Sequence, residues 1–350
     1  MKTVLLDKIA SVTSNVPLRK DVRVSDDFPC RQGDVLAVRI LNSKGTYNTL
    51  ELSTGRMSSL KAGDVIAGAL GHRNALQGYS GVVPKEIKVG DTIHLLNLGG
   101  VLGQCTSFSP IVGAPFECEV LGQVLHFPFL ASRVGVPANI SHEVGALDAE
   151  LKPGPWIIAV AGTCMNSGKT EACTTLIQQL TRQGLKVAAA KTTGVSLRRD
   201  VLGMEDAGAF KSSIFTDLGI VTTDRGSAPG LARTLINRLS EHKPDVIVLE
   251  LGDGLLGEYG VDAILEAPDI RNAFSCILLA AGDPVAAWGG YKLLQERYQL
   301  TPTVITGPAT DNLAGTELIQ NILGVPAINA RQNAQALADC VKARLAVARG

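Results

Sequence analysis

Residues 161–172 read AGTCMNSGKTEA and follow the apolar run PWIIAV near the middle of a chain of 350 residues. A loop that ends in Gly-Lys-Thr between a strand and a helix is typical of phosphate-binding sites. The apolar run is typical of a buried strand, and after the loop apolar side chains recur at helical spacing. We therefore expect a strand that ends at Val160 or Ala161, a loop over residues 162–167, and a helix that begins near Gly168.

The chemistry of such a loop depends on its backbone and on the side chains that follow it. Its N–H groups and those of the first helical turn converge on a phosphate, and Gly168 lets the backbone approach closely. Lys169 would bridge the β- and γ-phosphates, and the Thr170 hydroxyl would bind Mg²⁺. The alternative interpretation is a helix N-terminus with an exposed lysine. The predicted nucleotide-binding residues are Gly162, Thr163, Cys164, Met165, Asn166, Ser167, Gly168, Lys169, Thr170 and Glu171.

The spacing within the loop is unusual, because five residues rather than four separate Gly162 from Gly168. With Thr163 and the Gly-Lys-Thr ending, the loop resembles that of P-loop proteins in the dethiobiotin synthetase and cobyrinic acid a,c-diamide synthase group. Cys164 stands where that group has aspartate. The resemblance covers residues from about 156 to about 330 and implies an ATP- and Mg²⁺-dependent enzyme, often a homodimer.

Two later motifs extend the resemblance. AAAKTTG (188–194) is similar to the group's second-strand motif, which implies that Lys191 is catalytic and, with Thr193 and Gly194, holds an anionic substrate. DVIVLELGDG (245–254) is similar to a strand ending in Glu-Gly-x-Gly, which implies that Glu250 binds Mg²⁺. This chain departs from the pattern in two places: Thr192 replaces a proline and Leu251 replaces a glycine.

An acidic residue of the same group falls within RRDVLGMEDAGAF (198–210), where Asp200, Glu205 and Asp206 are candidates that spacing does not separate. We assign Asp206 to the metal site with Thr170 and Glu250. Lys169, Lys191 and Glu250 are the predicted catalytic residues.

The placement of these residues is also consistent with a general property of parallel sheets, whose strands end at one ligand-binding edge. Lys191 and Glu250 each end an apolar run, and Asp253 and Asp283 closely follow such runs. Two lysines and several carboxylates around a helix N-terminus would suit a magnesium nucleotide and an anionic co-substrate. Asp283 has the alternative role of a turn or helix-cap residue.

The chain has two halves with different patterns. From residue 156 onward, strand-like runs alternate with helical ones, which predicts a doubly wound, mostly parallel α/β sheet. The first half has short strand-like runs, and the Gly-Asp pair of RQGDVLAVRI, KAGDVIAGAL and KVGDTIHLLN precedes an apolar run each time. We expect a turn with positive φ at glycine, an aspartate bonded to the turn backbone, and then a strand.

The expected domains are therefore a mostly-β accessory domain over 1–145, in the form of a barrel or sandwich, a linker over 146–155, and a P-loop nucleotide-binding domain over 156–350. The accessory domain is a candidate for binding a substrate or partner.

Composition limits the classes of partner. Lys plus Arg and Asp plus Glu each number 33, so the net charge gives no reason to expect nucleic acid or a membrane surface as partner. The apolar runs are too short to span a bilayer, the chain begins with no apolar signal segment, and seven cysteines lie scattered without a CxxC pair. These features favour a cytoplasmic location for the protein.

The functional hypothesis is an ATP- and Mg²⁺-dependent enzyme that activates a small carboxylate or similar oxyanion by phosphoryl transfer, as an amide-forming ligase or a small-molecule kinase. ATP is favoured because VITGPATDN (304–312) lacks the Asn-Lys-x-Asp motif of guanine-specific proteins. Asn312 and residues 325–333 are candidates for contacting the base. The alternative is a nucleotide-gated binding or delivery protein, an ATPase or GTPase acting on a protein partner or cofactor.

Overall fold

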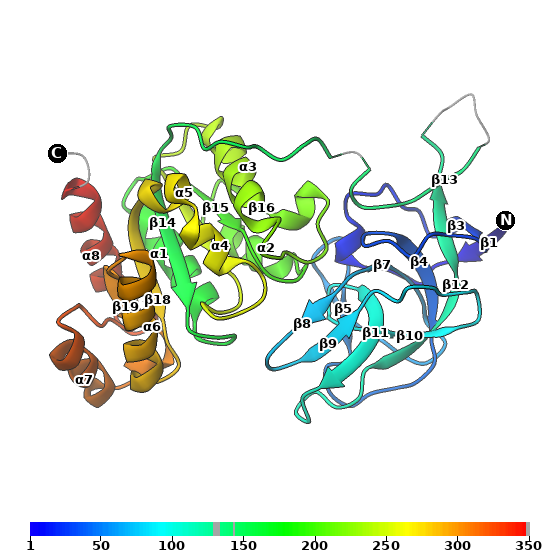
Figure 1. Ribbon diagram of the computed structural model, residues 1–350, viewed down its shortest axis with the longest axis horizontal. Coiled ribbons are helices and arrows are strands. Elements are labelled where there is room, and N and C mark those ends of the chain that lie inside the picture. Colours follow the sequence, from blue (N-terminus) through cyan, green and yellow to red (C-terminus); the bar gives the residue numbers. More distant parts are fainter. Residues whose placement is uncertain (129–133, 143, 348–350) are drawn as a thin grey trace. The chain divides into compact units, whose positions relative to one another are not determined.

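The computed structural model describes residues 1–128, 134–142 and 144–347, which form two compact units (Figure 1). The β-rich unit contains residues 1–145 together with two later segments, 195–199 and 215–222. The α/β unit contains residues 146–194, 200–214 and 223–350. Each unit is described separately below.

The β-rich unit is built around a small closed barrel. Its strands are β1 (Lys2–Leu5), β2 (Lys8–Ile9), β3 (Asp21–Ser25), β4 (Val35–Ile40), β5 (Thr49–Glu51), β6 (Met57–Ser59), β7 (Val65–Leu70), β8 (Arg73–Asn74), β9 (Tyr79–Val82), β10 (Thr92–Leu95), β11 (Val101–Phe108), β12 (Phe116–His126) and β13 (Val136–Pro137). Short 3-10 turns occur at η1 (Ser11–Thr13) and η2 (Phe215–Leu218). Strand β4 pairs with β7, β7 with β11, β11 with β10, β10 with β12, and β12 with β4, which closes the ring. The expectation of a mostly-β first half is confirmed, and of the two forms considered the barrel is observed.

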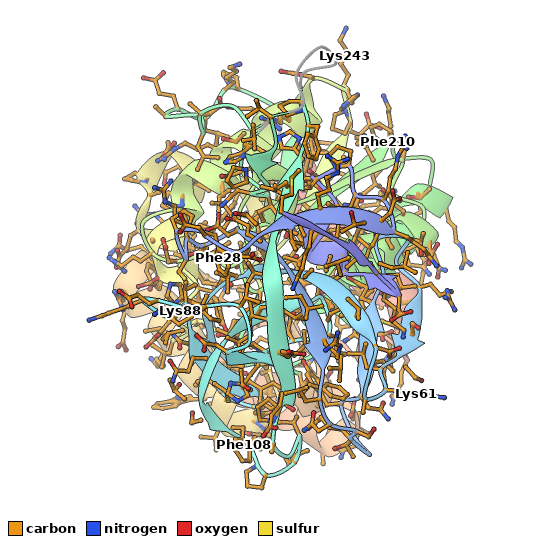
Figure 2. The ribbon with its side chains drawn as sticks, turned by 90° about the vertical axis from the view of Figure 1, so that its right-hand side faces the viewer. Phe28, Lys61, Lys88, Phe108, Phe210 and Lys243 are labelled. Atoms are coloured by element: carbon orange, nitrogen blue, oxygen red, sulfur yellow. The ribbon has the colours of Figure 1, made fainter. Side chains whose placement is uncertain are left out.

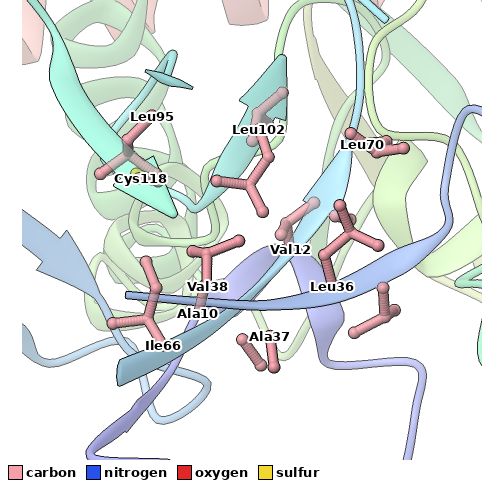
Figure 3. Close-up of a cluster of buried hydrophobic side chains, with 14 of the residues drawn as sticks. Ala10, Val12, Leu36, Ala37, Val38, Ile66, Leu70, Leu95, Leu102 and Cys118 are labelled. Atoms are coloured by element: carbon pink, nitrogen blue, oxygen red, sulfur yellow. The ribbon is translucent and has the colours of Figure 1, made fainter. Parts of the chain in front are cut away.

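The barrel core consists of aliphatic side chains from each of these strands. Leu36 and Val38 of β4 lie among Ile66, Leu102 and other fully buried side chains (Figure 3). Burying each such side chain contributes roughly 1.5–3 kcal/mol relative to leaving it in water. Closure of the ring also removes the unpaired strand edges that an open sheet of this size would expose.

Three of the barrel strands begin from the same local turn, as the repeated Gly-Asp pair predicts. Gly33, Gly63 and Gly90 have φ of 87°, 92° and 93°, the left-handed region that glycine adopts without steric cost. The aspartate that follows each glycine accepts a hydrogen bond from the backbone N–H three residues before it, at 2.7–2.8 Å, and β4, β7 or β10 follows. Lys61 and Lys88, the donors in the second and third turns, have side chains that project outward (Figure 2).

The α/β unit contains a six-stranded sheet in the order β16-β15-β17-β14-β18-β19, and every strand pair in it is parallel. The strands are β14 (Trp156–Gly162), β15 (Val187–Lys191), β16 (Lys211–Ile214), β17 (Val246–Glu250), β18 (Phe274–Ala280) and β19 (Val304–Thr306). The helices are α1 (Lys169–Arg182), α2 (Arg199–Asp206), α3 (Ala228–Ser240), α4 (Val261–Glu266), α5 (Pro268–Ala273), α6 (Pro284–Tyr298), α7 (Leu313–Leu323) and α8 (Ala334–Val347), and η3 spans Pro308–Thr310. None of the helices in the described part of the chain is long and apolar enough to cross a membrane.

Helices cover both faces of this sheet. Ala159 and Ala161 of β14 belong to one buried cluster with residues of α3, α4, α5 and α6. Ile158 and Val160 alternate with them and are also fully buried, on the face where α1 contacts β14. The predicted doubly wound, three-layer α/β architecture is therefore confirmed.

Several elements were not expected from the sequence. Helices α2, α4 and α5 are short, at eight, six and six residues, so helical periodicity is weak in them. Strand β16 has the sequence KSSI and forms a sheet edge, so it lacks the apolar run of a buried strand. Within residues 325–330, Ala327 forms one isolated bridge with Ile305 of β19.

The segment that precedes β14 is fixed against α3. The N–H of Asp148 donates to Thr234 Oγ1 at 2.7 Å, and the N–H of Lys152 donates to Asn237 Oδ1 at 3.0 Å. Asn237 in turn donates to the Asp148 carboxylate at 2.7 Å. Residues 148–152, at the centre of the expected linker, thus have defined hydrogen bonds within the α/β unit.

Leu294 of α6 provides a test of the buried cluster that Ala159 and Ala161 of β14 form with the helices on their face of the sheet. Its side chain is fully buried in the cluster described above. Leu294→Ala should lower the free energy of unfolding of the α/β unit by about 2–5 kcal/mol, because it leaves a cavity. Leu318→Ala on α7 is the matched control, since that leucine is 46% exposed, and its effect should stay within about 0.5 kcal/mol. Urea unfolding of the two variants measures both values; equal effects would contradict this packing.

Candidate functional site: a phosphate-binding loop and its acidic and basic neighbours

The loop between β14 and α1 has the predicted strand–loop–helix order. Strand β14 ends at Gly162, one or two residues later than expected, and α1 begins at Lys169. A Cβ atom on Gly162 would lie 2.4 Å from Ser167 Oγ, so the loop folds back tightly on its own beginning. Asn166 and Gly168 have φ of 60° and 94°, which turns the backbone toward the helix N-terminus. Thr163, Cys164, Met165, Thr170 and Glu171 are half-buried, Ser167 is buried, and Asn166 is exposed.

Lys169 is folded into the loop rather than extended into solvent. Its side chain is buried, and its ammonium group donates a hydrogen bond to the carbonyl oxygen of Cys164 at 2.7 Å. Burial lowers the pKa of Lys169, whereas the carboxylates of Glu250 and Asp253 oppose this shift. The alternative of an exposed lysine at an ordinary helix N-terminus is therefore wrong.

Glu250 lies at the centre of the site. It ends β17, and the sheet register places it beside Val160 of β14 and Lys191 of β15. The Thr170 hydroxyl donates to its Oε1 at 3.3 Å. Its Oε2 is buried, and none of the described residues donates a hydrogen bond to that atom. Burial raises the pKa of Glu250, whereas the ammonium of Lys191 lowers it.

The oxygens of Thr170 and Glu250 fit a hard divalent cation. Mg²⁺ prefers oxygen ligands and is usually bound through one or two protein groups together with phosphate and water. A cation at Glu250 Oε2 would satisfy a buried acceptor that otherwise carries a desolvation penalty. Within residues 1–128, 134–142 and 144–347, no cluster of three or more His, Cys, Asp or Glu side chains could hold a metal ion. The protein groups that would hold an ion here are therefore the oxygens of Thr170 and Glu250.

Lys191 forms an ion pair with Asp200, the second residue of α2, and lies 3.9 Å from Glu250 Oε1. The structure thus brings Asp200 to the site from among the three acidic candidates. Glu205 instead accepts a hydrogen bond from Ser212. Asp206 is the last residue of α2 and its side chain is exposed, so its proposed metal role rests on the motif alone.

The threonines after Lys191 fix neighbouring backbone. Thr192, which stands in place of a proline, is fully buried and donates to the carbonyl oxygen of Glu250 at 3.1 Å. The Thr193 hydroxyl donates to the carbonyl oxygen of Gly252 at 3.0 Å, and the Gly194 N–H donates to Thr223 Oγ1 at 2.9 Å. Thr193 and Gly194 follow Lys191 closely in the sequence. The Thr193 hydroxyl and the Gly194 N–H each donate a hydrogen bond within the protein.

The second departure from the motif has a clear physical reason. Leu251 is fully buried in the hydrophobic cluster, and its N–H donates to Val160 at 3.0 Å. Close backbone approach occurs one residue later, because a Cβ on Gly252 would lie 2.1 Å from the carbonyl oxygen of Thr193. A Cβ on Gly254 would lie 2.9 Å from the carbonyl oxygen of Thr163. The glycines that this edge requires are thus present at shifted positions.

The remaining acidic candidates have different roles. Asp283 caps α6, since its Oδ1 accepts the N–H of Ala286 at 2.8 Å, which is the alternative that the sequence left open. Asp253 is buried in the segment between Gly252 and Gly254 and has a φ of 72°. Its backbone therefore occupies the left-handed region that non-glycine residues rarely adopt.

A cavity of about 120 Å³ opens beside the loop and was only partly anticipated from the sequence. It is lined by Asn166, Gly168, Glu171, Gly307, Pro308, Asp311, Asn329, Ala330 and Arg331. Arg331 pairs with Glu171 at 3.1 Å across it, and Asn329 donates to Asp311 Oδ1 at 2.9 Å. The expected segment 325–333 thus contributes to the lining, whereas Asn312 caps α7 by accepting the N–H of Gly315.

Comparisons with known proteins give little beyond this geometry. No family model matches the chain, and no curated protein matches it. Among solved structures, the signal recognition particle receptor FtsY of Elizabethkingia anophelis is similar over 57% of this chain and 68% of its own, with 16% identity and a TM-score of 0.40. Signal recognition particle 54 kDa protein of Aeropyrum pernix K1, in complex with GDP, is similar over 58% and 50%, with 18% identity and a TM-score of 0.38. A duf1611 family protein from Anabaena variabilis is similar over 59% and 64%, with 14% identity and a TM-score of 0.42.

The class of the α/β unit follows from its own architecture. A parallel sheet, a glycine-containing loop after β14 and a lysine at the first position of α1 together define a P-loop fold. The unit has this fold, with the carboxyl ends of β14, β15 and β17 bringing Lys191 and Glu250 to the loop.

The close approach at Gly252 can be tested directly. Gly252→Ala should displace Thr193 and lower the free energy of unfolding by about 1–3 kcal/mol, because the added Cβ meets backbone rather than a flexible side chain. Gly282→Ala is the control. Gly282 lies just after β18, and a Cβ there would meet nothing within 4 Å, so this substitution should leave the free energy of unfolding nearly unchanged. Thermal or urea unfolding compares them, and equal stabilities would rule out the close packing of residues 251–254 on 193.

Proposed function

We propose that this protein binds a magnesium nucleoside triphosphate in the loop at residues 162–170 and transfers its γ-phosphoryl group to a small oxyanion. The observation that carries the proposal is the position of Lys169, whose buried ammonium lies within the loop on a backbone carbonyl. A phosphate would replace that carbonyl as the partner of the ammonium. Thr170 and Glu250 would hold Mg²⁺, which supplies neutralisation of charge on the β- and γ-phosphates.

The nucleoside would lie in the cavity next to the loop. Asn166, Gly168 and Glu171 belong to both the loop region and the cavity lining, so the cavity is continuous with the phosphate site. We propose ATP as the nucleotide, because residues 304–312 lack the Asn-Lys-x-Asp motif of guanine-specific proteins. Asp311 and Asn329 are among the polar side chains of the lining that could hydrogen-bond to a base.

Lys191 would hold the co-substrate. It lies at the edge where the γ-phosphate would end, and its present partners are the carboxylates of Asp200 and Glu250. A substrate carboxylate or carbamate could take the place of Asp200 on this ammonium. Such a nucleophile is already ionised, so the reaction depends on charge neutralisation and positioning more than on a general base. This chemistry favours an amide-forming ligase, with a small-molecule kinase as the close variant, in agreement with the motif resemblance to the dethiobiotin synthetase group.

A second candidate is a nucleotide-gated binding or delivery protein. The observation that favours it is the path of the chain after Gly194, where residues 195–199 belong to the β-rich unit before Asp200 returns to the α/β unit. A change at Lys191 on nucleotide hydrolysis would therefore act on a segment that packs in the other unit. Homodimer formation is a further proposal that rests on the motif resemblance.

Lys169→Ala tests the nucleotide site. It should abolish Mg-nucleotide binding while leaving the fold intact, because the removed ammonium group would contact the phosphates. Lys342→Ala on α8, an exposed helical lysine, is the control and should bind like the wild type. Isothermal titration with ATP and with GTP in the presence of Mg²⁺ measures binding and base preference together. Unchanged affinity in Lys169→Ala would disprove the site, and tighter binding of GTP would disprove the proposed base.

Product analysis separates the candidate reactions. Incubation with the preferred nucleotide, Mg²⁺ and a mixed set of small acids and amines should yield a dehydrated acid–amine adduct together with nucleoside diphosphate and phosphate. A phosphorylated acceptor identifies a kinase instead. Slow hydrolysis that no small acid stimulates would contradict the transfer reaction and support the gated protein. Mass spectrometry of the mixture distinguishes these outcomes.

A further inference from the structure

Glu51 is a buried carboxylate that the proposed chemistry does not use. It ends β5 and its side chain is fully buried. It accepts hydrogen bonds from the backbone N–H groups of Arg198 at 2.7 Å and Arg199 at 2.6 Å, and from the hydroxyl of Ser11. A buried charge is tolerated when such donors satisfy it, and hydrogen bonds to ionised acceptors are stronger than neutral ones. Two of these three donors to the carboxylate are thus consecutive backbone amides.

Other contacts within the β-rich unit hold the same segment. Asn97 donates to the carbonyl oxygen of Ser196 at 2.7 Å, and the Ser196 N–H donates to Val221 at 2.9 Å. A Cβ on Gly99 would lie 2.3 Å from that Ser196 carbonyl oxygen. Residues 195–199 therefore have a defined backbone path, and Glu51 fixes its last two residues.

The residue that follows this segment is Asp200. Arg199 is the first residue of α2, so Glu51 binds the N–H group at the start of that helix. Asp200 is joined to Arg199 by one peptide bond and makes its ion pair with Lys191 inside the α/β unit. The position of the Asp200 backbone, and hence the reach of its carboxylate, depends on where the preceding amides are held.

We propose that Glu51 is a positioning residue for the Asp200–Lys191 ion pair and acts along the backbone through Arg199. The catalytic consequence of this role rests on the proposed function, in which Lys191 holds an anionic co-substrate. The positioning itself does not, because the ion pair is formed by two side chains of this chain. Glu51 thereby affects, through the backbone of residues 198–200, the reactivity of a lysine that it does not contact.

The chemical reactivity of Lys191 tests the positioning. Acetic anhydride acetylates exposed, unpaired amines, and mass spectrometry measures the rate at each lysine in the full chain without nucleotide. Glu51→Gln should raise labelling of Lys191 by about tenfold, the change expected for loss of one hydrogen bond to a charged group. Glu119→Gln is the matched control, since Glu119 pairs with Arg39 at the surface of the same unit, and it should leave Lys191 labelling unchanged.

A double-mutant cycle separates positioning from general support of the fold. Asp200→Asn should raise Lys191 labelling by itself, and the double variant with Glu51→Gln should show no further rise, because both changes break one chain of contacts. Lys8, which pairs with Asp64 in the β-rich unit, reports on local unfolding. Three results would each overturn the proposal. The first is a rise in Lys191 labelling in the double variant that equals the product of the two single rises. The others are unchanged Lys191 labelling in Glu51→Gln and a rise at Lys8 in that variant as large as the rise at Lys191.

Two further measurements complete the test. Where Glu51→Gln does not give folded protein, Glu51→Asp can be used, because it keeps the charge on a shorter side chain. It should give a smaller rise in the labelling rate of Lys191, with the labelling rate of Lys8 unchanged. An unchanged labelling rate at Lys191 overturns the proposal. Where wild-type protein turns over nucleotide, Glu51→Gln should lower the KM of the anionic co-substrate by about tenfold, because Asp200 then competes less with it for Lys191. The nucleotide KM should stay unchanged, and an unchanged co-substrate KM overturns the catalytic part. Absence of any nucleotide binding by the wild type would refute the proposed function alone, because the labelling result stands without it.

Discussion

The α/β unit depends on how one buried carboxylate is neutralised. Glu250 ends a central strand of a parallel sheet, where desolvation disfavours its ionised form. The neighbouring strand β15 and the helix after β14 supply compensating groups: Lys191 at the end of β15 and Thr170 in the first turn of α1. The parallel register of β14, β15 and β17 and the folded position of Lys169 bring two ammonium groups and a hydroxyl donor to the same edge of the sheet.

The sequence was most informative where local chemistry determines structure. The strand–loop–helix order at the phosphate loop was predicted correctly, although β14 ends one or two residues later than expected. The three Gly-Asp turns were also predicted correctly, because positive φ at glycine and the Asp–backbone bond are properties of a few adjacent residues. Strands with continuous apolar runs, such as β14 and β17, were also predictable. The short helix α2 and the polar edge strand β16 were not, because their positions depend on residues far away in the sequence.

The same limit applies to the site. Lys169, Lys191 and Glu250 come together because each ends a strand or begins a helix at one sheet edge, which a sequence can indicate. The choice of Asp200 over Asp206 could not be made from spacing, since it depends on the direction of α2 after Gly194. Glu51 carried no motif, and its role becomes visible when a segment more than a hundred residues later donates its amides to it.

The composition of the β-rich unit has a consequence for how the chain is made. Its packing includes residues 195–199 and 215–222, which are translated well after Gly145. At a synthesis rate of about 5–20 residues per second, the interval between residues 145 and 222 lasts roughly 4–15 s. Before residues 198 and 199 follow, the nascent barrel can form its ring of strands, but the Glu51 carboxylate has none of the amides that later satisfy it. The β-rich unit therefore reaches its final packing only after residues 146–194 of the α/β unit have been synthesised, so its completion waits on a stretch of chain that belongs to the other unit.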